Sequence, residues 1–528
     1  MTHSELRAIR PAQSLARPAV AVASMLMLLT VLGIVLFVML RTPLKDDIAW
    51  LLYVARRWLA GRELYVDVVE VNPPLIVWIS AIPIQIAGVL RIDAQYTAIP
   101  FFVAAVLGCA WWTASLLRGT SRLFEDRVPV FAAIGTVLLV VPAGDLGQRE
   151  HLLVAAILPY LVLFSRSLDG DRPVLRDAVI AGALAGLGCA LKPRYAGVFV
   201  VLEVLALLRG LSPLRAQSIA AGAALLAYAG LIALICPAYL RRAVPLALAL
   251  YGASDAPFRH LLIDSLRLMF GQAVALLLWW NRRRRMPEAN LMLTLVVFAI
   301  TSTAICFMDG KDWFYHRLPA TIATLLALLC WAASVLFHRR ASARAAFLPV
   351  VLAGVGVVVF LVAAFQRLEP QVVLAVEPDQ MTVVKLERLI RQQKARTYIA
   401  FSEWIALGFP VVNNTGVAWA SRFDSMWALK GELWRARFDA SAAKEWPVRR
   451  WVAHDFIMGC PDIAVVDTRE GVVNYVGVLS ASDPAFARAW SRYRQIAAFD
   501  GLEVYRRAAT GCIDPWVAAE APQAIDAR

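Results

Sequence analysis

Charged side chains are scarce in this sequence. Only 17% of the 528 residues are Asp, Glu, Lys or Arg, while 60% are hydrophobic and the mean hydropathy is +0.63. A soluble domain is nearer half apolar and a quarter charged. The shortage therefore excludes an ordinary soluble protein. The long apolar runs, each able to cross a hydrocarbon core of about 30 Å, predict a helical membrane protein that crosses the bilayer several times.

Cysteine motifs are also sparse. The seven cysteines contain no Cys-x-x-Cys pair, which argues against a structural zinc site. Cys460 and Cys512 are the two in the polar C-terminal part, and an oxidising outer compartment would favour a disulfide between them. The other five lie in or beside apolar runs, as small buried hydrophobes do. No repeat of 20–50 residues and no low-complexity segment was found.

The charge that is present is mostly basic, with 53 Lys and Arg against 39 Asp and Glu and a formal net charge of +14. Such an excess can indicate a nucleic-acid partner. Most of the arginines, however, lie in short loops between apolar runs, where they mark the cytoplasmic side of a membrane protein. We therefore expect no nucleic-acid partner.

Residues 18–40 form the first apolar run. It is too long for the core of a signal peptide and lacks a clear cleavage site, so we expect a retained anchor. The tail before it carries Arg7, Arg10 and Arg17. These arginines predict a cytoplasmic N-terminus and an outer exit of the first span near Arg41.

The remaining crossings follow if arginine-rich loops stay in the cytoplasm. Residues 73–90 would break that rule if they spanned, and three prolines also disfavour a simple span, so we expect this run to lie in the interface. About eleven crossings result, at residues 18–40, 96–117, 128–141, 152–168, 178–191, 196–208, 218–236, 265–280, 291–307, 318–336 and 346–365. Residues 1–365 are thus predicted to form a transmembrane domain, with a first outer loop at residues 41–96.

The composition changes near residue 366, where polar residues become frequent. Short apolar runs predict strands at residues 397–401, 411–412 and 463–466. Residues 495–499 and 502–505, joined by Asp500-Gly501, predict a hairpin. Helical patterns at residues 381–394 and 484–494 alternate with these strands. We therefore expect residues 366–528 to form an extracytoplasmic α/β domain.

The first outer loop opens with two acids, Asp46 and Asp47, before an aromatic and basic amphipathic helix. Charged side chains beside a bilayer are energetically costly, so such residues are candidates for a functional site. A carboxylate there could act as a general base that deprotonates an attacking hydroxyl. The alternative is an ordinary cap for the helix that starts near Trp50.

A second outer acid, Glu150, lies in a loop with Asp145 and His151. It could face the first pair or bind a metal, and its alternative role is that of an acid at the start of a helix. Carboxylates such as Asp47 and Glu150 suit magnesium, manganese or calcium. Two acids do not establish a metal, so a divalent cation is a possible cofactor and no cofactor is certain.

Lys192 and Arg194 lie between two short apolar segments. Two cations at such a turn would suit a lipid phosphate, and the alternative is interfacial snorkelling. The same two interpretations apply to Arg56, Arg57, Lys311, His316 and Arg317. The aromatic residues Trp50, Trp58, Tyr65 and Trp78 could form an interfacial belt, a sugar platform or both.

These motifs resemble the GT-C superfamily of membrane glycosyltransferases. More narrowly, the chain is similar to bacterial members of the protein mannosyltransferase and aminoarabinose-transferase type, including the rhizobial lipopolysaccharide galacturonosyltransferase group. The matching motifs are Asp46-Asp47, Asn72-Pro73-Pro74-Leu75, Glu150, Lys192-Pro193 and the Tyr-His before Pro within residues 311–319. The resemblance covers roughly residues 20–340. Asn72 stands where relatives often have a basic residue, which puts one phosphate contact in doubt.

The resemblance implies transfer of a sugar from a polyprenyl-phosphate donor to a cell-envelope lipid, glycan or protein on the outer face of the bacterial cytoplasmic (inner) membrane. One inverting displacement needs one base, because cations can stabilise the phosphate leaving group. Asp46 is the expected base, with Asp47 and Glu150 beside it. The expected donor-phosphate contacts are Arg56, Arg57, Lys192, Arg194, Lys311 and His316, and the expected substrate-lining residues are Trp50, Tyr53, Tyr65, Asn72 and Tyr315.

Two alternatives remain open. A transporter or flippase of lipid-linked sugars would also use basic residues and carboxylates, but it would place them near the bilayer midplane. A glycan polymerase or ligase would depend more on outer-loop Arg and His than on Asp46.

The predicted topology can be tested by cysteine accessibility. Ser441→Cys should react with a membrane-impermeant reagent in intact cells, because residues 366–528 are expected outside, and Ser342→Cys should react only after lysis. Labelling of position 342 in intact cells, with none at 441, would contradict the topology.

Overall fold

The computed structural model describes residues 3–337, 343–439 and 442–508. Within them the chain is mostly helical and carries one five-stranded sheet. It divides into two compact units. Unit 1 comprises Met1–Leu40, Ile99–Ala229 and Ala256–Val373, and unit 2 comprises Arg41–Ala98, Gly230–Asp255 and Leu374–Arg528. Cys512, the expected partner of Cys460, lies outside the described residues.

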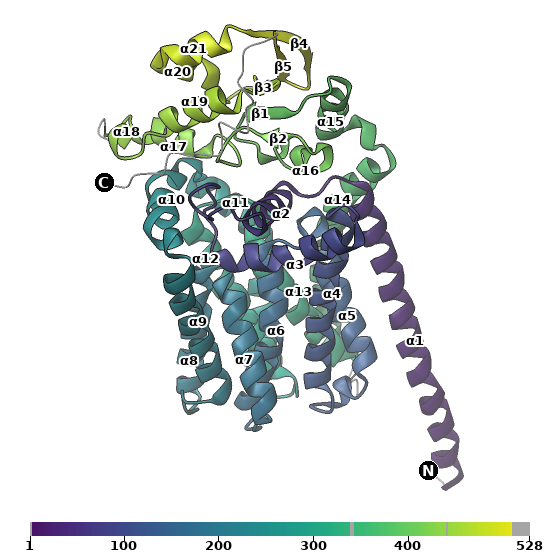
Figure 1. The fold of residues 1–528 in the computed structure, drawn as a ribbon. Coiled ribbons are helices and arrows are strands. Elements are labelled where there is room, and N and C mark those ends of the chain that lie inside the picture. Colours follow the sequence, from purple (N-terminus) through teal and green to yellow (C-terminus); the bar gives the residue numbers. More distant parts are fainter. Residues whose placement is uncertain (1–2, 338–342, 440–441, 509–528) are drawn as a thin grey trace. The chain divides into compact units, whose positions relative to one another are not determined.

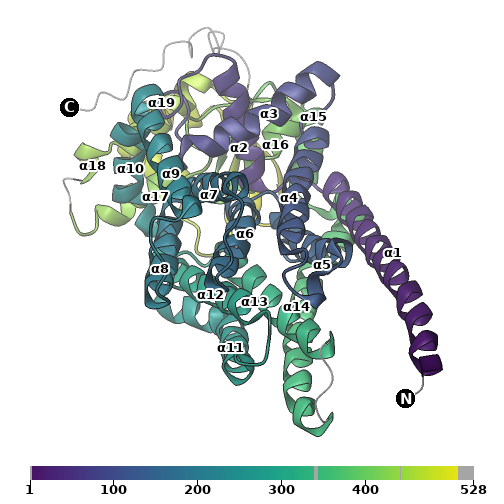
Figure 2. The same cartoon turned by 90° about the horizontal axis from the view of Figure 1, so that it is seen from below.

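Unit 1 is built from long helices that run alongside one another (Figures 1 and 2). They are α1 (His3–Arg41), α4 (Gln95–Leu117), α5 (Arg127–Val140), α6 (Arg149–Leu168), α7 (Leu175–Ala190), α8 (Ala196–Leu208), α9 (Ala216–Ile235), α11 (Phe258–Arg282), α12 (Ala289–Asp309), α13 (Phe314–Phe337) and α14 (Ala343–Val376). Each predicted crossing coincides with one of these helices. Seven helices in the described part are long and apolar enough to span a membrane, namely α1 from Pro18 onward, α4, α6, α9, α11, α12 and α13. A count of eleven crossings stays a prediction.

Helix α6 forms the centre of unit 1. Almost every one of its side chains is buried, and it packs against α7, α12 and α13. A helix that is apolar on all sides must be covered on all sides by other helices or by lipid. Neighbouring α7 approaches α9 closely because Gly182 and Gly186 face it: a Cβ atom at these positions would lie 2.2 Å from the Gln217 carbonyl oxygen and 2.5 Å from that of Ala221. Small residues spaced four apart are the usual means of such close helix packing.

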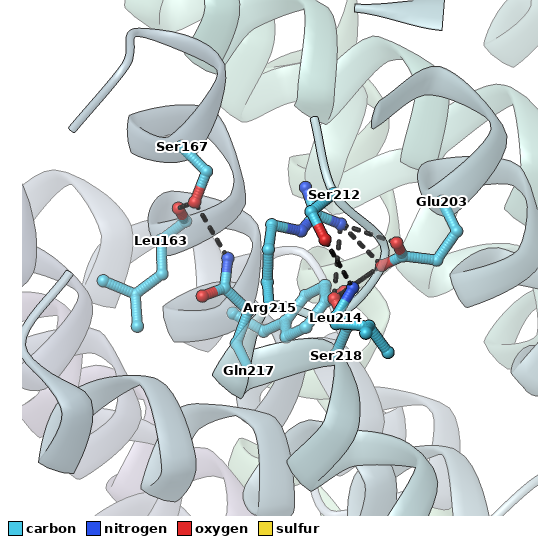
Figure 3. A network of polar contacts seen from close by, with 9 residues as sticks. Leu163, Ser167, Glu203, Ser212, Leu214, Arg215, Gln217 and Ser218 are labelled. Carbon is cyan, nitrogen blue, oxygen red and sulfur yellow. Dashed lines mark hydrogen bonds and ion pairs between the residues drawn. The ribbon is translucent and has the colours of Figure 1, made fainter. Parts of the chain in front are cut away.

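A polar network joins α6, α8 and α9 (Figure 3). The Arg215 guanidinium donates to both carboxylate oxygens of Glu203 at 2.7 Å, and the Ser218 hydroxyl donates to the same carboxylate at 2.6 Å. Gln217 donates to the Ser167 hydroxyl at 3.0 Å. Polar groups within a membrane domain need such partners, because an unsatisfied group in an apolar medium costs several kcal/mol. The network therefore fixes how these helices meet.

Unit 2 combines the first predicted outer loop with the C-terminal sheet. Its helices are α2 (Asp46–Leu59), α3 (Pro74–Leu90), α10 (Val244–Leu250), α15 (Thr382–Gln392), α16 (Val411–Thr415), α17 (Trp427–Arg435), α18 (Ala442–Glu445), α19 (Val448–Gly459), α20 (Tyr475–Ser482) and α21 (Pro484–Trp490). Helix α2 packs directly against the C-terminal part of the unit, because the side-chain amide of Asn413 donates to the Ala49 carbonyl at 3.0 Å and Phe409 contacts Trp50. The assignment of residues 1–365 to the membrane and 366–528 to the outside stays a prediction.

The sheet has the order β2-β1-β3-β5-β4, with strands β1 (Thr397–Phe401), β2 (Ala418–Trp419), β3 (Ile463–Asp467), β4 (Tyr493–Phe499) and β5 (Leu502–Arg507). Strands β2, β1 and β3 are parallel, and β5 and β4 are antiparallel to their neighbours. Both β1 and β3 are buried along their whole length, as parallel strands covered on both faces are. The predicted strands at residues 397–401 and 463–466 and the predicted hairpin are confirmed.

The predicted strand at residues 411–412 is wrong. Val411 and Val412 begin the short helix α16, which ends at Gly416 in the left-handed conformation, with φ 73°. A two-residue apolar run cannot distinguish a strand from one turn of helix. The strand in this part of the chain that pairs with β1 is β2, which begins seven residues after Val411 and has only two residues.

Candidate functional site

A cluster of charged side chains lies where four helix ends of unit 1 meet. The Lys192 ammonium is 2.7 Å from Glu150 Oε1 and 2.6 Å from Asp309 Oδ2. Arg194 Nη1 is 2.5 Å from Asp309 Oδ1, and both ring nitrogens of His316 are within 3.6 Å of one of the two carboxylates. We call these five residues the unit 1 cluster.

Each member of the cluster is placed by a helix end. Glu150 lies in the first turn of α6, where an acid is stabilised by the helix dipole. Lys192 precedes the short 3₁₀ helix Pro193–Tyr195, between α7 and α8. Asp309 is the last residue of α12, which Gly310 ends with φ 69°, and His316 lies in the first turn of α13. Helix ends converge here, and so their capping groups and charges converge as well.

Two buried members of the cluster, Glu150 and His316, are incompletely hydrogen-bonded. Glu150 is fully buried, and within the described part of the chain its Oε2 atom has no hydrogen-bond partner. Nδ1 of His316, whose side chain is 7% exposed, lies 3.4 Å from Asp309 Oδ2 but forms no hydrogen bond there. Buried polar atoms normally form hydrogen bonds, so each exception needs an explanation. One explanation is a bound ligand that donates a hydrogen bond to Glu150 and accepts one from His316.

Further charged side chains surround the cluster. Arg149 and Lys311 lie close enough for their charges to act on Glu150 and His316, respectively. Nearby, Arg317 is paired with Asp312 at 2.8 Å. Lys192 and Arg194 thus have further cations near them, and an anionic ligand could use such a setting.

The predicted donor-phosphate residues differ in their availability. Lys192 is engaged by two carboxylates, and its side chain is only 12% exposed. Arg194 has one carboxylate partner and is 54% exposed, so it can turn toward an anion more easily. Lys311 is buried, with its ammonium 5.9 Å from the Trp313 ring centre. Tyr315, predicted to line the substrate, stacks on Trp313 and meets the His316 ring edge-on.

Unit 2 holds the acidic pair that was predicted as the catalytic centre. Asp46 and Asp47 form the first turn of α2. Asp46 Oδ1 accepts a hydrogen bond from the Asp47 amide at 2.9 Å and is 3.3 Å from the Lys45 ammonium. Asp46 thus makes the local contacts of a helix-start acid, and this geometry is compatible with either of the roles considered for it.

Two further acids, Glu70 and Asp424, accompany Asp47 in unit 2. The Glu70 carboxylate accepts hydrogen bonds from the Trp50 indole and from the backbone N–H of Asn72, the latter at 2.6 Å. Burial raises the pKa of Asp424 to about 8, and the negative charges of Glu70 and Asp47 act in the same direction. Like charges that share a site keep one of them protonated. Asp47, Glu70 and Asp424 therefore form an acidic group in which a proton is held near neutral pH.

The sequence prediction did not name Glu70 or Asp424 as site residues. Glu70 stands two residues before the Asn72-Pro73-Pro74 turn, and that position was the one available signal. Asp424 lies some 350 residues further along the chain in a loop without a motif, so no sequence pattern marks it. Only the folding of the first loop against the C-terminal part brings its charge close to the other two acids.

The predicted aromatic residues of unit 2 mostly pack against other residues. Trp50 is buried and lies 4.8 Å from the Phe409 ring centre and 5.6 Å from that of Tyr53. Tyr65 is also buried, and its hydroxyl donates to the Asn72 carbonyl at 2.7 Å. Both rings thereby shape the turn that leads to Pro73. Arg56 and Arg57 lie in the last turn of α2.

The two groups of residues belong to different units. Asp46 and Asp47 are in unit 2, whereas Glu150, Lys192 and His316 are in unit 1. Their expected meeting, and a metal held between Asp47 and Glu150, stay predictions. Across residues 3–337, 343–439 and 442–508, no three His, Cys, Asp or Glu side chains are grouped in a way that could hold a metal ion.

Comparisons with known proteins identify the fold. The sequence matches no family model and no curated protein. Two solved structures of ArnT from Cupriavidus metallidurans are similar to it, one bound to undecaprenyl phosphate and one in the apo state. Both align with a TM-score of 0.53 over 91% of this chain and 97% of the other, at 13% and 12% sequence identity. This likeness shows that the chain shares its overall fold with ArnT.

The Lys192 ion pairs give a stability prediction. Lys192→Met should destabilise the protein by about 3–5 kcal/mol, because it leaves buried carboxylates without their cation. Adding Glu150→Gln should restore part of that loss. The control Arg194→Met removes a half-exposed cation and should cost about 0–1 kcal/mol. Thermal unfolding in detergent measures all four proteins, and equal effects of the two single variants would contradict the assignment.

The pKa of Asp424 gives a pH prediction. The folded protein keeps this carboxyl protonated up to about pH 8, whereas the unfolded chain releases the proton near pH 4. The stabilisation is therefore present below pH 4 and is lost as the pH rises to about 8. Wild-type unfolding temperature should fall between pH 5 and 8 more steeply than that of Asp424→Asn. The exposed control Asp379→Asn should keep the wild-type slope, and an unchanged slope in Asp424→Asn would refute the prediction.

Proposed function

We propose that this protein is a membrane glycosyltransferase that moves a sugar from a polyprenyl-phosphate donor to a cell-envelope lipid, glycan or protein. The observation that carries the proposal is the unit 1 cluster, which places Lys192 and Arg194 at the turn between two helices, within a fold that matches a structure bound to undecaprenyl phosphate over 91% of the chain. A lipid phosphate needs cations at the membrane surface, and this cluster supplies them on helix ends.

The donor phosphate is proposed to bind at the unit 1 cluster. Arg194 is the cation most able to reorient toward it, because half of its side chain is exposed and it has a single carboxylate partner. Lys192, held between Glu150 and Asp309, contributes positive charge from a fixed position. Developing negative charge on the departing phosphate would be stabilised by these preorganised cations. No general acid is then needed at the leaving group.

The acceptor is proposed to be activated by an acid of unit 2. Asp46 is the proposed base: it would take the proton of the acceptor hydroxyl as the hydroxyl oxygen attacks the anomeric carbon and the bond to phosphate breaks. Attack from the side opposite to the phosphate inverts the anomeric centre. Asp47 and Glu70 supply further negative charge in the same unit, and Asp424 keeps a proton near neutral pH. The mechanism uses no metal, since no step in it requires one.

The site of action is proposed to be the outer face of the bacterial cytoplasmic membrane. The arginine-rich short loops support this orientation by the positive-inside rule. Lipopolysaccharide is one acceptor consistent with the sequence resemblance. The C-terminal part of unit 2 would then lie in the periplasm.

Substitution of single residues separates catalysis from donor binding. Asp46→Asn should lower the rate of sugar transfer about 10²–10⁴-fold, as loss of a general base does, and should leave affinity for undecaprenyl phosphate unchanged. Asp47→Asn is the matched control and should cost less. Transfer is measured as release of labelled sugar from a polyprenyl-phosphate donor, and binding is measured separately with undecaprenyl phosphate.

The same assays test the cationic site. Arg194→Ala should weaken binding of undecaprenyl phosphate about fivefold to thirtyfold, since a hydrogen bond to a charged group contributes about 1.5–3 kcal/mol in mutational series and partial exposure reduces it. Arg209→Ala removes an exposed arginine at the far end of α8 and should change nothing. Normal transfer by both Asp46→Asn and Glu150→Gln would remove the catalytic centre and favour a transporter, flippase or glycan ligase instead.

A further inference from the structure

A polar cavity of about 520 Å³ lies within unit 2, beside the C-terminal end of strand β3. Its polar lining groups are Asp467, Thr468, Asn474, Ser480 and Glu503, and its aromatic wall consists of Trp490 and Tyr505. Pockets for small molecules commonly have volumes of about 300–1,000 Å³. This cavity is therefore large enough for one or two sugar rings.

The sheet topology places the cavity where ligands usually bind in such folds. Strand β3 is the last of three parallel strands, and its other neighbour, β5, is antiparallel. Crevices beyond the carboxyl ends of parallel strands are the preferred binding sites of open α/β sheets. Val466 pairs with Glu503 in this register, so their side chains share a face of the sheet with Tyr505, two residues further along. Helices α20 and α21 lie close to this part of the sheet (Figure 1).

The polar groups are of the kind that bind hydroxyls. Asn474 Oδ1 accepts a hydrogen bond from the Gly477 amide, which leaves the Asn474 NH₂ group as a donor. Glu503 Oε2 accepts a hydrogen bond from the Tyr505 hydroxyl at 2.7 Å, so Oε1 of the same carboxylate is available as an acceptor. The Ser480 hydroxyl can both donate and accept. A sugar hydroxyl also does both and thus matches this set.

The aromatic wall completes the match. The ring centres of Trp490 and Tyr505 lie 5.0 Å apart, and both side chains are partly exposed. Such rings offer an apolar surface next to polar groups. A pyranose ring also combines apolar and polar surface, since its C–H groups form apolar patches between its hydroxyls. Phosphate and carboxylate ligands fit less well, because Glu503 presents a negative charge to the cavity.

The local charges refine the choice of sugar. Asp467 is neutralised by Arg469, whose Nε and Nη2 atoms lie 2.8 Å and 2.5 Å from its two oxygens, and it also accepts a hydrogen bond from Ser402. Glu503 has no cation within ion-pair distance in the described part of the chain. One uncompensated carboxylate therefore faces the cavity. It should favour a neutral or amino sugar over an acidic one.

We infer that this cavity of unit 2 is a carbohydrate-binding site for neutral or amino sugars, separate from the groups proposed for catalysis. The inference rests on the geometry of unit 2 alone and does not need the proposed transferase activity. Within a glycosyltransferase, such a site would hold a saccharide of the acceptor rather than the lipid-linked donor.

Saturation-transfer NMR on the full-length protein in detergent tests the inference. The probes are glucosamine, glucose and glucuronate. Wild type should give signals in the order glucosamine, glucose, glucuronate. Glu503→Gln should weaken glucosamine binding about tenfold, as loss of a hydrogen bond from a charged group does, and should affect glucose less. The control Glu470→Gln alters an exposed carboxylate on the neighbouring loop that does not line the cavity, and it should behave as wild type.

A second variant separates the cavity from other sugar sites in the chain. Ser480→Phe should fill the cavity and abolish the signals of all three probes, while thermal unfolding shows that the protein is folded. Absence of any sugar signal in wild type would overturn the inference. Sugar signals that persist unchanged in both Glu503→Gln and Ser480→Phe would overturn it as well.

Discussion

The ion pairs of Lys192 are the constraint on which unit 1 depends. One ammonium group lies between Glu150 and Asp309, which belong to different helices and are both nearly inaccessible to solvent. Buried carboxylates would be strongly unfavourable without it. Because these groups are held at helix ends, the ion pairs fix the start of α6, the end of α12 and the turn before α8 together. A site built this way is preorganised, which is what electrostatic catalysis needs.

Unit 2 contains a group of acidic side chains. Asp47, Glu70 and Asp424 are acids whose repulsion, together with burial, keeps a proton on Asp424 near neutral pH. The Trp50 indole and the Asn72 amide hold the Glu70 carboxylate. An inverting sugar transfer from a phosphate donor requires cations for the phosphate and a base for proton removal. The residues proposed for these two roles lie in separate compact units.

Sequence reasoning recovered the parts of this arrangement that local patterns encode. Apolar runs marked the helices, the alternation near Asp500-Gly501 marked the β4–β5 hairpin, and short motifs marked Asp46, Glu150 and Lys192. It could not show that Lys192 pairs with Glu150, since 42 residues separate them, nor that Asp309 completes the cluster. Asp424 and the cavity beside β3 are equally hidden, because each arises from segments that only tertiary packing brings together. Val411 was misassigned since its apolar run is too short to show a period.

The unit 1 cluster is proposed to bind the phosphate of a polyprenyl-phosphate donor. The most direct measurement is an experimental structure of the protein in lipid nanodiscs with undecaprenyl phosphate added. We expect density for the phosphate beside Arg194 and Lys192, with the Arg194 guanidinium turned from Asp309 toward the lipid. Phosphate density at another place in the chain, with the ion pairs of Arg194 and Lys192 unchanged, would contradict it.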